Sequence, residues 1–218
     1  MAATNAEFGS GTLFKAAGTV HGVMVGTGLL VLANLPVLAV PLLGPLALPT
    51  LILMGPAFVA ACYAFKRLIA GSDTGVFRDF VKSYGLNFRQ ALVVWLPYLA
   101  LLAVIAANLI SLPGSNPETV AARAGLLGLG VLVCTAAVHA LLLLARFSFR
   151  TADIYRLSLY SLGMAKRVSL GNAGMLFVTG FVLLSTTAWL TPFIGGLVLY
   201  LICLNSRPLL KTVEARFT

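Results

Sequence analysis

Long apolar runs, separated by short polar or basic segments, dominate the pattern along this chain. A helix needs about 20 mostly apolar residues to cross the hydrocarbon core of a bilayer. Runs of about that length are predicted at residues 18–38, 48–69, 91–112, 120–144, 173–190 and 193–210. The last two runs are short, so a single re-entrant hairpin is the alternative there. The pattern predicts an all-α polytopic membrane bundle of about six transmembrane helices, with residues 1–218 forming one integral membrane domain.

Two basic segments, residues 77–97 and 146–172, interrupt these runs. Aromatic and basic residues alternate at helical spacing in the first segment, and this combination is typical of a helix in the lipid headgroup layer. We expect each segment to form a cytoplasmic amphipathic elbow helix that contacts lipid, or, alternatively, that docks a cytoplasmic partner. The candidate contact residues are Phe77, Arg78, Lys82, Gly85 and Arg89 in the first segment and Tyr155, Arg156, Gly163 and Arg167 in the second.

The two basic segments also resemble each other in sequence. When the chain is shifted by 78 residues, Arg78, Ser83, Gly85 and Arg89 coincide with identical residues, namely Arg156, Ser161, Gly163 and Arg167. This predicts an internal repeat of two hairpins, residues 48–112 and 120–190, related by an axis along the membrane normal. The alternative is chance similarity between two basic amphipathic loops.

Composition and charge support a membrane location. Of the 218 residues 60% are hydrophobic and 10% charged, whereas soluble domains carry about 25% charged residues. With six spans, every Lys and Arg except Arg123 lies on one side, and cytoplasmic loops carry an excess of these residues. We therefore place the chain in the bacterial cytoplasmic membrane with both termini in the cytoplasm. The net charge of +9 then reports topology, and we expect membrane lipid rather than nucleic acid as a partner.

A few small and polar residues lie inside the predicted spans. Gly18, Gly22 and Gly26 form two overlapping GxxxG steps in the first run, which lets another helix approach closely; packing within the chain or with a second copy are both open. Ionisable and polar groups inside a bilayer are costly and are candidates for function. The candidates are His21, His139, Asn34 and Asn108. The two histidines could face each other or a cavity, or each could be a neutral hydrogen-bonded core group.

Several kinds of chemistry are disfavoured by the sequence. All six carboxylates lie outside the predicted spans, which disfavours ion-coupled transport, and no catalytic, nucleotide-binding or zinc motif is present. We expect no enzymatic activity, no cofactor and no metal. Cys62, Cys134 and Cys203 lie in apolar runs without paired spacing, so they are interpreted as reduced packing residues.

Three short motifs carry a resemblance to a known family. Gly55-Pro56-Ala57, Phe77-Arg78-Asp79-Phe80 and Asn87-Phe88-Arg89-Gln90-Ala91 resemble the YesL-like family of bacterial integral membrane proteins, a domain of unknown function. The resemblance covers residues 55–97. Members of that family are often encoded beside binding-protein-dependent sugar ABC importers, which implies a role in carbohydrate uptake. The resemblance supplies no catalytic or ligand residues.

The first functional hypothesis is a non-enzymatic membrane subunit that assists carbohydrate uptake by associating with permease or ATPase subunits of a sugar ABC importer. A weak similarity supports such docking: Gly85 precedes Val94-Trp95-Leu96-Pro97, as a glycine precedes an apolar-x-Leu-Pro sequence in sugar-importer permeases. The alternative is a self-sufficient channel or facilitator for a small solute, as a single bundle or a homo-oligomer. A membrane interaction or sensor protein is the third hypothesis.

Overall fold

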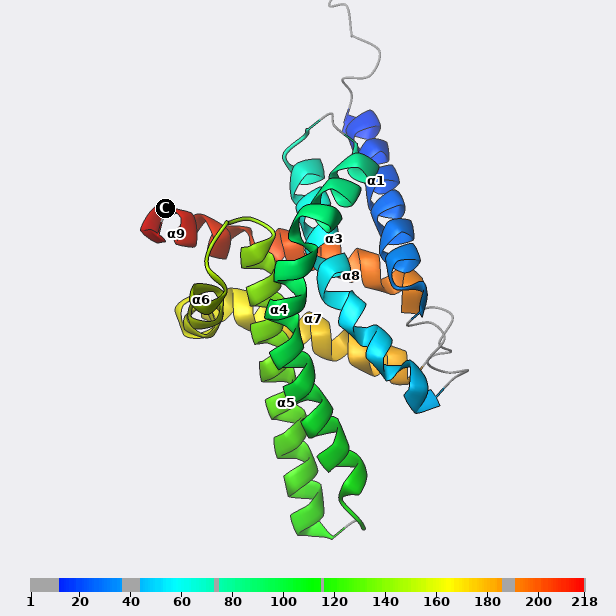
Figure 1. The fold of residues 1–218 in the computed structure, drawn as a ribbon, viewed down its shortest axis with the longest axis vertical. Helices are drawn as coiled ribbons and strands as arrows, with labels where there is room; N and C mark the ends of the chain where they lie inside the picture. The colour runs from blue at the N-terminus through cyan, green and yellow to red at the C-terminus, as the bar shows by residue number, and fades with distance from the viewer. Residues whose placement is uncertain (1–11, 37–43, 73–74, 115, 186–190, 218) are drawn as a thin grey trace, which may run out of the picture.

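The chain folds into helices that pack side by side in one bundle (Figure 1). The computed structural model describes residues 12–36, 44–72, 75–114, 116–185 and 191–217, and these residues form helices and no strand. The elements are α1 (Thr12–Ala33), the 3-10 helix η2 (Gly44–Leu53), α3 (Met54–Ile69), α4 (Val76–Ser111), α5 (Pro117–Leu144), α6 (Thr151–Met164), α7 (Lys166–Ser185), α8 (Thr191–Asn205) and α9 (Arg207–Phe217).

Four helical segments are long and apolar enough to cross a membrane: Lys15–Ala33, Pro49–Ile69, Val76–Ser111 and Pro117–Leu144. A fifth is reached if α8 and α9, which are bent by 45° relative to each other, count as one span. The described residues therefore support an all-helical membrane fold with four or five candidate spans. They do not reach the predicted six, because α7 is not among the candidates. Residues 37–38 and 186–190 of the predicted spans lie outside the described part of the chain.

Helix α3 occupies the centre of the bundle and contacts α1, α4, α5 and α8. Its residues Ala57, Ala60, Ala61 and Ala64 are fully buried. Alanine side chains bring neighbouring backbones close to each other, so one helix can be surrounded on several sides. In Figure 1, α1, α3, α4 and α5 alternate in direction, whereas α7 and α8 run crosswise to them; α7 contacts α5, and α8 contacts α1, α3 and α7.

The structure of α4 contradicts the elbow helix predicted for the first basic segment. Residues 77–90 do not form a separate elbow helix, because they are the first part of a continuous helix of 36 residues. At 1.5 Å per residue this helix is about 54 Å long, and the hydrocarbon core of a bilayer is only about 30 Å thick. The basic N-terminal part of α4 is therefore continuous with its apolar part, and the whole helix is longer than such a layer is thick.

The second basic segment differs from the first. It forms α6 and then the beginning of α7, and the two helices are separated at Ala165, whose φ and ψ are −111° and 56°. The Ala165 N–H closes the last turn of α6 by donating to the Ser161 carbonyl at 3.0 Å, and the Ala165 carbonyl accepts from the Ser169 N–H at 2.9 Å. A separate amphipathic helix therefore exists in the second segment only.

The glycines of α1 lie partly against α3. A Cβ atom added to Gly22 would meet Leu68 Cδ1 at 2.7 Å, and one added to Gly26 would overlap with Phe65 Cε1. A Cβ atom on Gly18 would meet nothing within 4 Å. The second GxxxG step thus allows contact between helices of the same chain.

Candidate docking surface on α4 and the polar contacts that position it

The N-terminal part of α4 has one buried and one exposed side. Asp79, Phe80, Ser83 and Ala91 are buried against the bundle. The opposite side is exposed and combines cations with large apolar groups; Phe77 and Leu86 keep 61% and 75% of their surface accessible. This exposed surface, called the α4 face below, consists of Phe77, Arg78, Val81, Lys82, Gly85, Leu86 and Arg89.

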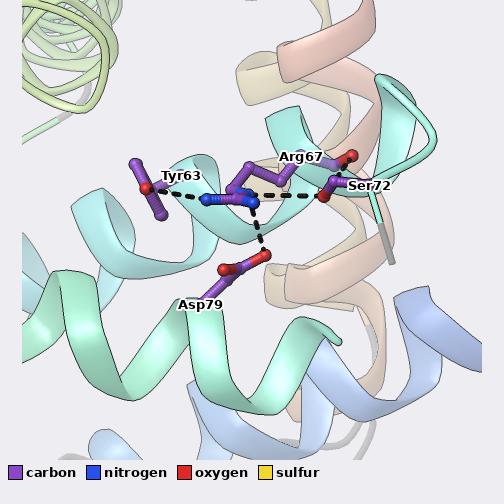
Figure 2. Close-up of polar contacts among 4 residues, drawn as sticks. All are labelled: Tyr63, Arg67, Ser72 and Asp79. Carbon is purple, nitrogen blue, oxygen red and sulfur yellow. Dashed lines mark hydrogen bonds and ion pairs between the residues drawn. The ribbon is translucent and has the colours of Figure 1, made fainter. Parts of the chain in front are cut away.

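An ion pair fixes the direction in which the α4 face points. Arg67 near the end of α3 contacts the Asp79 carboxylate in the first turn of α4, with 3.2 Å between Nε and Oδ2 (Figure 2). The Asp79 side chain is only 5% exposed and the Arg67 side chain 31%. Arg67 also donates to the Ser72 hydroxyl at 3.3 Å and to the Tyr63 hydroxyl at 3.4 Å. A buried carboxylate needs such partners, so the contact holds the start of α4 against α3.

Two glycines with positive φ shape the link between these helices. Gly71 has φ 73° and Gly75, at the N-cap of α4, has φ 83°. Residues with a side chain rarely adopt this region. The chain can therefore turn sharply after α3 and bring Asp79 back to Arg67.

Pro97 lies in the middle of α4, and Tyr155 of α6 replaces the helical hydrogen bond that the proline removes. A proline has no N–H, so the carbonyl of the residue four positions earlier loses its helical partner. That carbonyl belongs to Val93, and the Tyr155 hydroxyl donates to it at 2.6 Å. Burial, and then the neighbouring Tyr98, raise the pKa of the Tyr155 hydroxyl, which keeps it protonated as this donor role requires. The Tyr155 hydroxyl thus supports α4.

The other candidate residues of the second segment are exposed. Arg156 on α6, Gly163 near its end and Arg167 at the start of α7 all face outward. The exposed basic residues of both segments are therefore available to lipid or to a partner.

A buried hydrogen-bond network surrounds His139, which is fully inaccessible. His139 Nδ1 lies 2.8 Å from the Ser161 hydroxyl, and Nε2 lies 3.2 Å from the side-chain nitrogen of Asn172. Asn172 also donates to the Ser206 hydroxyl at 3.0 Å and accepts from Asn205 Nδ2 at 2.8 Å. The network joins α5, α6, α7 and α8 to the junction before α9.

The donors in this network define the state of His139. The Ser161 hydroxyl donates to the Ser158 carbonyl at 2.7 Å, so its oxygen accepts a hydrogen bond from the Nδ1–H of His139. The Asn172 amide donates to Nε2, so Nε2 carries a lone pair and the ring is neutral. Each polar atom of His139, Ser161 and Asn172 has a partner inside the bundle. We conclude that the network connects the helices and does not present groups to a solute.

The remaining polar candidates lie apart from this network. His21 on α1 is exposed, so the two histidines do not face each other. Asn108 donates to the Val104 carbonyl of α4, and Asn34, which directly follows α1, donates to the Leu30 carbonyl of α1, each at 2.8 Å. Both asparagines bind the backbone of the preceding turn, and neither is bonded to the other.

The cysteines are free thiols. Cys62 of α3 and Cys203 of α8 are buried with their sulfur atoms 3.5 Å apart, and Cys134 is half-buried. The spacing in sequence does not indicate the proximity of Cys62 and Cys203, because it results from the packing of α3 against α8. No group of three or more His, Cys, Asp or Glu side chains that could hold a metal ion occurs in the described residues.

Sequence reasoning missed the residues that hold the site together. From the sequence, Asp79 is placed with the other carboxylates outside the predicted spans and is assigned no structural role, although it lies at helical spacing from Ser83 on the buried side of α4. Asn172 and Ser206 had no sequence signal, since each acquires its role from packing of distant helices. The phase of the amphipathic pattern would have identified Asp79 as a buried carboxylate.

These features define a helical protein with the long apolar helices that an integral membrane protein requires. Residues 23–109 match the model of a family described as "Protein of unknown function, DUF624". The match covers the second half of α1, all of α3 and nearly all of α4, including the α4 face, and it supports a domain of unknown function in this part of the chain. No curated protein and no solved structure matches the chain.

Proposed function

We propose that the protein is a non-enzymatic membrane subunit that assists carbohydrate uptake, and that the α4 face docks it on a permease or ATPase subunit of a sugar ABC importer. The observation that carries the docking role is the exposure of Phe77 and Leu86 beside Arg78, Lys82 and Arg89 on a helix held rigidly by the Arg67–Asp79 pair. Exposed apolar groups among cations are typical of an interaction surface. The sugar importer as partner is supported by the resemblance to the YesL-like family.

The proposal includes a topology. We place the N-terminal part of α4, the helices α6 and α9 and both chain termini in the cytoplasm of a bacterium, because nearly all Lys and Arg residues lie at that end of the spans. We further propose six crossings, with α7 and α8 as the last two. In this arrangement the α4 face meets the cytoplasmic side of a permease.

The internal repeat is also part of the proposal. Equivalent residues of the two segments have the same exposure: Ser83 and Ser161 are buried, and Arg78 and Arg156 are exposed. Arg89 and its equivalent Arg167 are exposed as well. A common pattern of burial supports a common origin for the two segments, even though only one of them is a continuous helix.

The test is affinity purification in mild detergent from the native host grown on different glycans, followed by mass spectrometry. We expect a sugar permease or its ATPase to copurify in stoichiometric amount with the wild-type protein. Because charge reversal would oppose docking, the variant with Arg78→Glu, Lys82→Glu and Arg89→Glu should lose most of that partner. The matched control carries Arg78→Lys, Lys82→Arg and Arg89→Lys, which keeps each charge and should keep the partner.

Two results would contradict this function. If the wild-type protein purifies only as a homo-oligomer on every glycan, a self-sufficient facilitator replaces the importer subunit. If the charge-reversed variant retains the partner as well as the control does, the docking role of the α4 face is wrong.

A further inference from the structure

A cavity of about 330 Å³ lies where the C-terminal ends of α3, α5 and α8 meet the first turns of α9. Four cationic side chains line it, one or two from each of α3, the end of α5 and α9: Lys66, Arg146, Arg207 and Lys211. Lys66 and Arg146 are half-buried, whereas Arg207 and Lys211 are exposed at the edge. The buried thiols of Cys62 and Cys203 form part of an apolar wall. The cavity therefore offers positive charge above an uncharged interior.

Acidic groups compensate these cations only in part. Glu214 of α9 forms an ion pair with Arg146 and also attracts Lys66, whereas Arg146 and Arg67 repel Lys66. The C-terminal end of a helix adds about half a negative charge and the N-terminal end about half a positive one. We count the charges of the four cations and Glu214, the negative C-terminal ends of α3, α5 and α8 and the positive N-terminal end of α9. This count leaves an excess of about two positive charges in the cavity. Like charges at short distance in a half-buried cavity are unfavourable.

We propose that this cavity binds one phosphate-bearing anion. A phosphorylated group carries a charge of about −1.5 to −2 near neutral pH, which matches the excess, whereas a carboxylate supplies only one charge. Guanidinium groups bind phosphate oxygens in pairs, and lysines add a point charge. The volume is at the lower end of the range of about 300–1,000 Å³ found for small-molecule sites, which suits a compact phosphorylated head group.

Two sources of this anion have the same chemistry. Basic pockets between membrane helices on the cytoplasmic side bind anionic lipid head groups, and soluble phosphorylated compounds reach the same surface. The cavity is built by α3, α5, α8 and α9 and uses no residue of the α4 face. The site therefore does not depend on the proposed docking to an importer.

The test uses the full-length protein purified in a neutral detergent and calorimetric titration with two probes. One probe is inorganic phosphate alone, and the other is short-chain phosphatidic acid, whose head group is a phosphate monoester, with zwitterionic phosphatidylcholine as the reference lipid of no net charge. We expect one saturable site for at least one probe, with binding at least about tenfold weaker in the Arg207→Gln/Lys211→Gln variant, because each lost charge-assisted contact is worth more than a neutral one. The Arg78→Gln/Lys82→Gln variant removes the same charge from α4 and should bind within about twofold of wild type.

The outcomes separate the sources and can overturn the site. Saturation by phosphatidic acid but not by inorganic phosphate assigns the anion to a lipid head group, and saturation by inorganic phosphate but not by phosphatidic acid assigns it to a soluble compound. Absence of saturable binding of both probes, or an equal loss in the α4 control, shows that the cavity is not an anion site. The Arg207→Gln/Lys211→Gln variant without ligand should unfold at the same temperature as wild type, which verifies its fold. The titration is repeated with Lys66→Gln, which removes a cation from the inner wall of the cavity and should also weaken binding.

Discussion

Helix α4 and the α6–α7 pair begin with similar sequences and are held in the bundle by different means. Both present arginines outward and a serine inward, at Ser83 and Ser161. In α4 an ion pair between Asp79 and Arg67 fixes the first turn against α3. At the position equivalent to Asp79 the second segment has Leu157, which is packed in an apolar cluster. One pattern of exposure is therefore compatible with two kinds of anchoring.

The same comparison shows where the helix can break. Asn87 in the middle of α4 donates to the Ser83 hydroxyl at 3.1 Å, one turn back along the helix. Its equivalent is Ala165, which has no side-chain hydrogen bond to offer, and there α6 ends. The Ser158 and Ser161 hydroxyls instead bind backbone carbonyls three residues back, at 2.8 and 2.7 Å. Such local contacts compete with regular helix formation, and after the break Ser169 and Asn172 are buried in the bundle.

The largest expected effect comes from exchanging the anchoring residues. Leu157→Asp would bury a carboxylate in a cluster with Leu143 and Val213, and the residue equivalent to Arg67 is Ala145. An unpaired buried charge costs about 3–5 kcal/mol, so this variant should unfold far more easily than wild type. The reverse change, Asp79→Leu, should cost about 2 kcal/mol, because the ion pair with Arg67 is lost while Arg67 keeps Tyr63 and Ser72.

Chemical denaturation in detergent micelles measures both changes as free energies of unfolding. Equal losses for Leu157→Asp and Asp79→Leu would mean that the two segments are anchored in the same way, contrary to the comparison. The unchanged α-helical circular dichroism of Asp79→Leu serves as the control that the fold is retained.

A smaller difference is expected between the two buried serines. Ser161→Ala removes the acceptor of the His139 Nδ1–H, which is fully buried, and should cost about 1–3 kcal/mol because a buried donor is left without a partner. Ser83→Ala removes the partner of Asn87, which is half-buried and reaches water, and should cost about 0.5 kcal/mol. Thermal unfolding of both variants under one condition checks the order. A larger loss for Ser83→Ala would show that the network around His139 contributes little to stability.

The sequence predicts much of this molecule, and the failures have physical reasons. Hydrophobic run length correctly predicts the helical class, the approximate positions of α1, α3 and α5 and the apolar part of α4, since burial in lipid depends on local composition. The predicted elbow at residues 77–90 is wrong. An amphipathic pattern indicates which side of a helix is polar, but it does not indicate whether the helix bends or continues straight where the polar residues end. The environment of His139 could not be predicted, because Ser161 and Asn172 reach it only through the packing of α5, α6 and α7.

The smallest expected effect concerns Tyr155 and its equivalent Phe77. The Tyr155 hydroxyl donates to the Val93 carbonyl that Pro97 leaves without a helical partner, so Tyr155→Phe should cost about 1 kcal/mol. Phe77 is largely exposed, so Phe77→Tyr should change stability by no more than about 0.5 kcal/mol.

A double-mutant cycle isolates the cause of the Tyr155 effect. Pro97→Ala restores an N–H that can donate to the Val93 carbonyl within α4, so Tyr155→Phe should cost clearly less in that background than in wild type. The measurement is the free energy of unfolding of the two single variants and the double variant. If Tyr155→Phe costs the same with and without Pro97, the tyrosine acts through ring packing with Tyr98, whose ring centroid lies 5.9 Å away, and not through the carbonyl. A smaller cost of Tyr155→Phe in the Pro97→Ala background would mean that α6 stabilises the turn of α4 that contains the proline, although α6 itself ends at Ala165.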